Sequence, residues 1–334
     1  MTPPTEPREL NASTIRETAI GFQASRVLLT AVELDVFTAI GEGSTTSDEV
    51  ALAIGARPRS TDRLLNALCA LGFLTKAAGR FTNTKEARRF LVRGSPGFMA
   101  GLGHTASMWK AWSGMTEAVR TDRPALRQTV NERGDQWLEP FIAAMHYRAE
   151  QQADRLVRAF DLTRVERVLD VGGGSGSFAM AFCRRRPGLS AVVFDLPNVV
   201  PLTRRYVAEA GLSDRVTAVV GDYLEVENLP GGFDLIFLSA VIHSNGPAEN
   251  EALIAKCAWA LNPGGRVAVV DFIMDDDRLS PPVGAMFALN MLVATDEGDT
   301  YTESEVRGWM ESAGLSGISR TDTAFGTAII QGRR

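Results

Sequence analysis

Hydrophobic residues in the first part of the chain recur close to the 3.6-residue period of an amphipathic helix. The pattern begins after Asn11, continues to Ile40 and stops at Gly41-Glu42-Gly43, which predicts an apolar helical block over residues 15–40. Such a face exceeds what a small domain buries by itself, so we expect a homodimer in which it packs against a second copy. Its helical positions are Ile15, Ala19, Phe22, Val27, Leu28 and Ala31.

Residues 44–93 carry the pattern of two short helices followed by a hairpin. Ser47 is suited to cap the first helix, and Ser60 or Thr61 the second. The order of helix, turn, helix and hairpin predicts a winged helix. The predicted elements are helices over residues 47–54 and 62–71 and strands at residues 73–75 and 80–82.

The pattern changes after a glycine-rich linker, Gly94 to Gly103. Apolar strands then alternate with helices, which predicts an α/β fold with a mostly parallel, doubly wound, Rossmann-like sheet. We expect a disordered tail over residues 1–10, a mainly helical winged-helix domain over 11–95 and the α/β domain over 96–334. The predicted helices cover residues 104–121, 135–160, 177–185, 199–210 and 250–261, and the strands cover 165–171, 190–194, 216–220, 233–238 and 266–272.

Composition excludes several classes of protein. Apolar residues make up 45% of the 334 and charged residues 22%, as in ordinary globular proteins. The net charge of −5 argues against a nucleic-acid or anionic-membrane coat, and no apolar run reaches the ~18 residues of a membrane helix. Three scattered cysteines favour neither a metal site nor disulfides. No signal peptide is visible, so we expect a cytoplasmic protein without a bound metal.

A glycine loop is the strongest local motif. The apolar stretch from Val168 runs into Gly172-Gly173-Gly174-Ser175-Gly176, and a helix follows. Asp195 closes the next strand, where an acid that binds ribose hydroxyls is expected. The spacing GxGxG differs from the GxGxxG of dinucleotide binders. Asp170 at the mouth would repel a pyrophosphate but accept from an ammonium group, which favours S-adenosylmethionine (SAM) over NAD.

Six segments in order make the chain resemble SAM-dependent small-molecule O-methyltransferases of the plant caffeate and bacterial antibiotic type. The resemblance implies a class I methyltransferase domain, an N-terminal winged-helix dimerisation domain, a small-molecule acceptor and S-adenosylhomocysteine (SAH) as product. The segments are LDVGGGSG (169–176), VVFDLPNVV (192–200), GDYLE (221–225), FDLIFLSAVIHS (233–244), LNPGGRVAVVDFIMDDD (261–277) and YTESEVRGWMESAGL (301–315).

The resemblance also implies a set of cofactor residues. Gly172, Gly174 and Asp195 match positions that hold the amino-acid part and the ribose, and Asp222 with Tyr223 matches a pair flanking the adenine. Ser239 stands where many relatives carry a lysine. With Asp170 and Leu196, the predicted cofactor site comprises Asp170, Gly172, Gly174, Asp195, Leu196, Asp222, Tyr223 and Ser239.

His243 is the predicted catalytic base. It follows the fourth strand, at the carboxyl edge of an open α/β sheet where ligands bind. Methyl transfer requires a deprotonated acceptor, and histidine is suited to take a phenolic proton. Relatives read His-Asp-Trp where this chain has His-Ser-Asn. They flank the base with two acids, one matched by Asp271 and the other by Thr300, which is no carboxylate.

The acceptor pocket is less legible in the sequence. Segments that line it in the resembling family contain Trp109, Met145, Phe287, Asn290, Met291 and Thr295, although such residues on helices are as often core. His104 and His146 are interpreted as helix-surface residues. We expect O-methylation of a small phenolic metabolite. C-, N- or S-methylation, or SAM binding without transfer, remain alternatives because fold resemblance does not decide among them.

A winged-helix DNA-binding regulator is the alternative of another class. Residues 44–93 hold nine basic and four acidic residues. The helix that would read bases is leucine-rich, however, and only Arg63 and Asn66 are suited to reach base edges, where three or four side chains are usual. We therefore expect no nucleic-acid partner.

Overall fold

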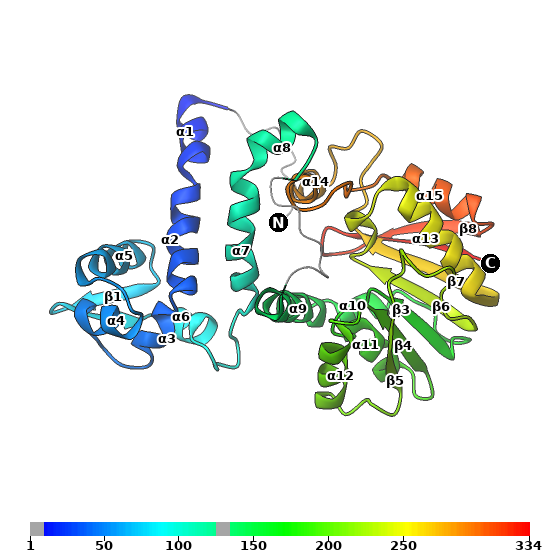
Figure 1. Ribbon diagram of the computed structural model, residues 1–334, viewed down its shortest axis with the longest axis horizontal. Helices are drawn as coiled ribbons and strands as arrows, with labels where there is room; N and C mark the ends of the chain where they lie inside the picture. The colour runs from blue at the N-terminus through cyan, green and yellow to red at the C-terminus, as the bar shows by residue number, and fades with distance from the viewer. Residues whose placement is uncertain (1–9, 125–133) are drawn as a thin grey trace. The chain divides into compact units, whose positions relative to one another are not determined.

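One mixed sheet of seven strands organises the second half of the computed structural model, which describes residues 10–124 and 134–334 (Figure 1). The neighbouring strands β5, β4, β3, β6 and β7 pair in parallel, and β9 is antiparallel to both β7 and β8. The predicted mostly parallel, doubly wound sheet is confirmed. Its order is β5 (Val216–Val220), β4 (Ser190–Asp195), β3 (Arg167–Val171), β6 (Phe233–Ser239), β7 (Leu261–Asp271), β9 (Ala328–Arg333) and β8 (Ser316–Asp322).

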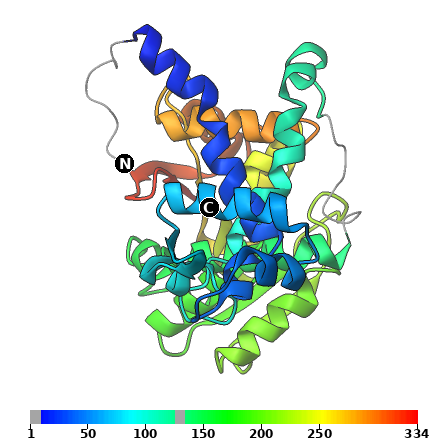
Figure 2. The same ribbon diagram turned by 90° about the vertical axis from the view of Figure 1, so that its left-hand side faces the viewer.

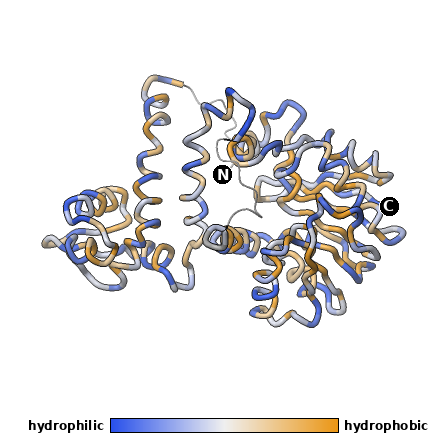
Figure 3. Tube along the Cα trace, viewed as in Figure 1, coloured by the Kyte–Doolittle hydropathy of each residue, from blue (hydrophilic) through white to orange (hydrophobic). Residues whose placement is uncertain are grey.

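Helices cover both faces of this sheet because alternate strand residues point to opposite sides. On β6, Leu235 and Phe237 join one core cluster, whereas Ile236 and Leu238 join the other. The strands are largely orange in Figure 3, as expected for strands buried on both faces. The first cluster includes helices α10 (Ala153–Val157), α11 (Ser177–Arg185) and α12 (Val200–Glu209), and the second includes α13 (Pro247–Ala260) and α15 (Glu303–Ser312).

Two predicted helices are each divided in the structure. The helix expected over residues 104–121 is α7 (Gly101–Ser113) and α8 (Met115–Thr121), separated at Gly114. The helix expected over residues 135–160 is α9 (Asp135–Glu150) and α10. Helix α14 (Pro282–Ala294) and strands β8 and β9 were not predicted.

The chain forms two compact units, Met1–Trp109 and Lys110–Arg334. Residues 96–109, assigned from the sequence to the α/β domain, thus cluster with the first unit. The predicted tail over residues 1–10 lies outside the described residues except for Leu10. Among the described helices, none is long and apolar enough to cross a bilayer.

The first unit contains the predicted order of helix, helix and hairpin (Figure 2). The second helix begins earlier than expected, because Pro58 occupies its first turn and Ser60 bonds the carbonyl of Arg57 instead of capping. Arg63 and Asn66, proposed to reach DNA bases, both contact Asp62. The elements are α4 (Ser47–Ala53), α5 (Pro58–Ala70), β1 (Leu74–Ala77), β2 (Arg80–Asn83) and α6 (Lys85–Leu91).

The apolar block over residues 15–40 is three helices rather than one: α1 (Ala12–Ile20), α2 (Phe22–Glu33) and α3 (Val36–Ile40). Helices α1 and α2 follow one another almost in line (Figures 1 and 2). The chain turns before α3 at Asp35, whose φ of 57° is left-handed. None of the residues of α1 is buried.

Asn83 fastens the hairpin to α3 inside this unit. Its side chain is 1% exposed, and Nδ2 donates to the carbonyl oxygens of Phe37 and Gly41, both at 2.8 Å. Both carbonyls lie at the end of α3, and that of Phe37 already accepts the backbone N–H of Gly41. The amide therefore adds a second donor to Phe37 and supplies one to Gly41, where the helix has ended.

We predict that Asn83→Ala lowers the free energy of unfolding of the first unit by about 1–3 kcal/mol, because buried acceptors lose their donor. Asn66→Ala is the matched control, since Asn66 bonds Asp62 and Lys76 at the surface and should cost less than about 0.5 kcal/mol. Urea unfolding of the full chain, followed by circular dichroism, measures both. Equal losses would contradict the assignment.

Candidate active site

The carboxyl ends of β3, β4 and β6 meet at the edge where strand order reverses, the usual place for ligands in such sheets. The glycine loop leaves β3 and enters α11. Gly172, Gly174 and Gly176 have φ values of 65°, 57° and 76°, which favour glycine. At Gly172 a Cβ atom would also lie 2.9 Å from Cγ2 of Val241. The predicted strand, glycine loop and helix are therefore present.

The structure brings Asp195 to this loop, as expected from the spacing. Its Oδ2 accepts from the backbone N–H of Gly174 at 2.7 Å, and its Oδ1 accepts from that of Leu196 at 2.7 Å. Burial raises the pKa of Asp195 to about 6, against the lowering effect of these two hydrogen bonds and with a further rise from the charge of Asp222. Leu196 packs against the cluster of Leu138, Ile142 and Val199.

Asp170 is more deeply placed than the sequence suggested. It is 1% exposed and lies beneath Gly173, where a Cβ atom would be 2.6 Å from its Cγ. Oδ2 accepts from the backbone N–H of Ala179, whereas buried Oδ1 has no partner. Burial raises its pKa to about 7, opposed by the Ala179 bond and helped by the charge of Asp195. An orphaned buried carboxylate oxygen calls for a cationic or protic partner.

Asp222 and Tyr223 follow β5, next to the same loop. Asp222 Oδ1 accepts from the backbone N–H of Leu224 at 2.9 Å. Tyr223 donates its hydroxyl to Oδ1 of Asn245 at 3.1 Å, and burial raises the pKa of this phenol. Asn245 Nδ2 in turn donates to Asn250. The asparagine in the unusual His-Ser-Asn segment thus anchors the tyrosine beside the loop.

His243 lies on the single 3₁₀ turn η1 (Ile242–Ser244), just beyond β6. Its Nδ1 is 2.8 and 3.0 Å from the two carboxylate oxygens of Asp271, which ends β7. Asp271 is 3% exposed and also accepts from the backbone N–H of Phe272. The predicted base and its acid are therefore in direct contact. Half-buried Ser239 ends β6, and Ala240, with φ of 58°, turns the chain toward His243.

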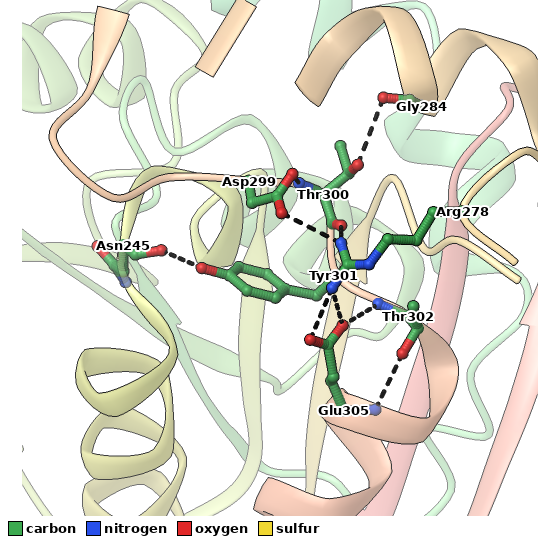
Figure 4. A network of polar contacts seen from close by, with 8 residues as sticks. All are labelled: Asn245, Arg278, Gly284, Asp299, Thr300, Tyr301, Thr302 and Glu305. Atoms are coloured by element: carbon green, nitrogen blue, oxygen red, sulfur yellow. Dashed lines mark hydrogen bonds and ion pairs between the residues drawn. The ribbon is translucent and has the colours of Figure 1, made fainter. Parts of the chain in front are cut away.

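Thr300, at the position of the second acid in relatives, belongs to a structural network (Figure 4). It is 2% exposed, and its hydroxyl donates to the carbonyl of Gly284 in α14 at 3.4 Å. Arg278 donates to the Thr300 carbonyl and pairs with Glu305. Next in sequence, Tyr301 donates to the backbone carbonyl of Asn245. Through the Tyr301 bond to Asn245, this segment stabilises the turn that carries His243, but Thr300 contributes no carboxylate to it.

Among the six predicted acceptor residues, Phe287 contacts the proposed base. Phe287 of α14 meets the His243 ring edge-on, with centroids 4.9 Å apart. Three others have structural roles. Asn290 accepts a hydrogen bond from Trp112, Met291 is buried at 7% exposure, and Thr295 donates to the Met291 carbonyl at the end of α14. Met145 is half-buried on α9, and Trp109 lies in the first compact unit, where it contacts Phe22 and Arg26.

His146 was interpreted as a helix-surface residue, and the structure corrects this. Its Nδ1 lies 3.0 Å from the hydroxyl of Ser175 on the glycine loop and 2.9 Å from that of Ser177 at the start of α11. Its ring stacks on Tyr206 at 4.0 Å, and burial lowers its pKa. Arg148, two residues after His146 on α9, was also missed. Nothing in the local sequence distinguishes either residue, because their partners lie on other elements.

The searched part of the structure contains no cluster of three or more histidine, cysteine or acidic side chains arranged to hold a metal ion. The site consists instead of a glycine loop with two buried acids and a separate histidine–carboxylate pair. The first arrangement suits a ligand with hydroxyl and ammonium groups. The second suits removal of a proton.

Comparison with known proteins gives the family. Residues 112–316 match the model of the O-methyltransferase domain, and residues 17–93 that of the O-methyltransferase dimerisation domain. The chain is 33% identical over 321 residues to 3-hydroxy-5-methyl-1-naphthoate 3-O-methyltransferase of Streptomyces sahachiroi, covering 94% of this chain and 92% of that protein. It is 32% identical to the tetracenomycin polyketide synthesis 8-O-methyl transferase TcmO of Streptomyces glaucescens, covering 100% and 99%.

Among solved structures, PigF with SAH superposes with a TM-score of 0.89 at 26% identity, covering 97% of this chain and 100% of PigF. A protein of this name is known from Serratia sp.. The shared fold, the two matched models and the near-complete coverage agree with one another. The chain is a member of the O-methyltransferase family, with an O-methyltransferase dimerisation domain followed by an O-methyltransferase domain.

Proposed function

We propose that this protein methylates a hydroxyl group of a small aromatic metabolite, with SAM as methyl donor, SAH as product and His243 as the base. The observation that carries the proposal is the hydrogen-bonded pair of His243 and Asp271 on the same sheet edge as the glycine loop. The relative of Streptomyces sahachiroi is a methyltransferase of a hydroxynaphthoate, which supports an aromatic acceptor.

The residues around the glycine loop fit the proposed cofactor. Asp170 Oδ1 is buried without a partner, which suits an ammonium group that reaches it directly or through water. Asp195 is fixed by two backbone N–H groups and keeps lone pairs for ribose hydroxyls. Tyr223, held by Asn245, and Asp222 would flank the adenine, with Leu196 and Ser239 at the rim.

When bound, SAM supplies a methyl group activated by its positive sulfonium. The work left to the chain is placement of the acceptor and removal of its proton. Asp271 accepts from Nδ1–H of His243, which fixes the tautomer and leaves Nε2 as the proton acceptor. A phenol has a pKa near ~10, so a base beside it raises the fraction of the reactive anion. The His243–Asp271 pair then carries the proton as an imidazolium beside a carboxylate.

A homodimer is proposed from the first unit. Helix α1 and the start of α2 expose Ile15 by 60%, Ile20 by 49% and Phe22 by 55%. These apolar side chains lie within one continuous stretch and remain largely exposed in the described part of the chain, although Phe22 contacts Trp109. The dimerisation model matched by residues 17–93 supports a second copy of the chain as that cover.

We predict that Asp170→Asn makes the ligand-free protein more stable at pH 8 by up to about 4 kcal/mol, since one pKa unit is worth about 1.4 kcal/mol. The folded carboxyl has a pKa near 7 against 3.8 for an ordinary aspartate. The wild type therefore loses stability as pH rises from about 4 to 7, and the variant should lose less. SAH affinity should fall at least tenfold, because the amide offers an ammonium no charge. Thermal unfolding across pH and calorimetry measure both effects. An unchanged pH dependence would refute the buried-charge interpretation.

For the base, His243→Ala should reduce turnover by about 10²–10⁴-fold while SAH affinity changes less than about threefold. Asp271→Asn should show a smaller loss of turnover, since it disturbs only the tautomer. Exposed Ser244 provides the control substitution Ser244→Ala. Single-turnover rates with a hydroxylated aromatic panel measure this, and carbon NMR of the product distinguishes O-methyl from C-, N- or S-methyl. Full turnover without the imidazole would remove the base from the mechanism.

For the dimer, sedimentation velocity at micromolar concentration should show two copies. The double variant Ile15→Lys with Ile20→Lys should sediment as a monomer, because four buried lysines would be introduced at a two-fold contact. Leu52→Lys is the control, since Leu52 is 86% exposed on α4. A wild type that sediments as a monomer, or a double variant that remains dimeric, would place the contact elsewhere.

A further inference from the structure

A guanidinium group lies at the end of an aromatic row beside the proposed base. Arg148 is in the last turn of α9, and its Cζ is 5.4 Å from the ring centre of Phe272. Phe272 packs on Phe287 with ring centres 4.5 Å apart, and Phe287 meets His243 at 4.9 Å. One arginine, two phenyl rings and the imidazole therefore follow one another in space. The row stands next to Asp271.

Arg148 makes no hydrogen bond or ion pair within the described residues; its contacts are the Phe272 ring and the charge of Asp271. That carboxylate is already used, since His243 engages both oxygens and the Phe272 N–H engages one. The side chain remains exposed, although surrounding protein atoms lower its pKa. A guanidinium carries five N–H donors, so it keeps its full capacity for an anion.

The direction of Arg148 separates it from the proposed cofactor region. On the same helix, His146 contacts Ser175 of the glycine loop and Ser177 at the start of α11. Residues two positions apart do not share a helix face. Arg148 accordingly meets Phe272, just after β7, on the side of His243. The guanidinium there interacts with the charge of Asp271, the carboxylate that His243 contacts.

We propose that Arg148 binds a carboxylate on the methyl acceptor, so that the substrates are hydroxylated aromatic acids. This inference rests on the proposed function. The carboxylate would accept two parallel N–H bonds from the guanidinium, which fixes both position and orientation. The aromatic ring would lie against Phe287, with the hydroxyl at Nε2 of His243. The arginine would thus select the hydroxyl that is methylated by its distance from the acid group.

The test compares a hydroxynaphthoate with its neutral carboxamide, which share size, ring and hydroxyl group. Calorimetry with SAH-saturated protein gives the affinity of each probe for wild type, Arg148→Gln and Arg148→Lys. The control is Arg158→Gln, an exposed arginine just beyond α10. SAH affinity is measured separately for every variant. Methylation of both probes is followed by NMR of the products.

We expect wild type to bind the carboxylate at least tenfold more tightly than the carboxamide. Arg148→Gln should weaken carboxylate binding about 10–100-fold and leave carboxamide and SAH binding within threefold, because the carboxylate loses charge-assisted hydrogen bonds that the carboxamide and SAH do not use. Arg148→Lys should keep part of the preference because it keeps the charge but loses the paired geometry. Arg158→Gln should behave as wild type.

Three results would overturn the inference. Equal affinity of wild type for both probes, or equal loss of both in Arg148→Gln, would show that the guanidinium does not read the acid. A loss of SAH affinity in Arg148→Gln would assign it to the carboxylate of the cofactor. If the carboxamide is methylated while any of these results is obtained, the proposed function still stands. Failure of wild type to bind SAH would instead refute the proposed function, and this inference with it.

Discussion

Carboxylates buried at strand ends set the character of this site. Asp170, Asp195 and Asp271 end or nearly end β3, β4 and β7, and each is less than one-tenth exposed. Ionised carboxylates are costly to bury without partners, and the pKa values of the first two are raised accordingly. Among the described residues, Asp271 contacts His243, a side chain able to carry positive charge, whereas Asp170 and Asp195 accept from backbone N–H groups. The other two favour a cationic ligand, which SAM would provide.

The backbone arrangement follows from that constraint. Gly173 has no side chain because a Cβ atom there would collide with the Asp170 carboxyl, and the Gly174 N–H is held by Asp195. These contacts shape the loop before any ligand arrives. A preformed loop lowers the ordering cost of binding. Its buried carboxylates reduce the stability of the free protein in return.

Behind the site, neutral polar groups hold the catalytic turn. Asn250 donates to the carbonyl of Ile242, and Tyr301 donates to that of Asn245. Asn245 also links this turn to Tyr223, beside the glycine loop. The proposed base and the proposed adenine-binding tyrosine are therefore positioned by one residue. This explains the value of asparagine in a segment that departs from the usual family pattern.

The sequence by itself determined the alternating α/β architecture, the glycine loop and the pairing of that loop with Asp195, because period, spacing and glycine chemistry are local properties. It also indicated His243 and Asp271 through the order of six motifs. Tertiary structure alone decided which candidates are occupied by packing: Asn290 by Trp112, Thr295 by its own helix end and Thr300 by Gly284. It likewise placed His146 on the loop and Arg148 near the base, since both depend on how α9 crosses the sheet edge. Contacts between elements distant in sequence leave no periodic signal, and a single chain does not encode them legibly.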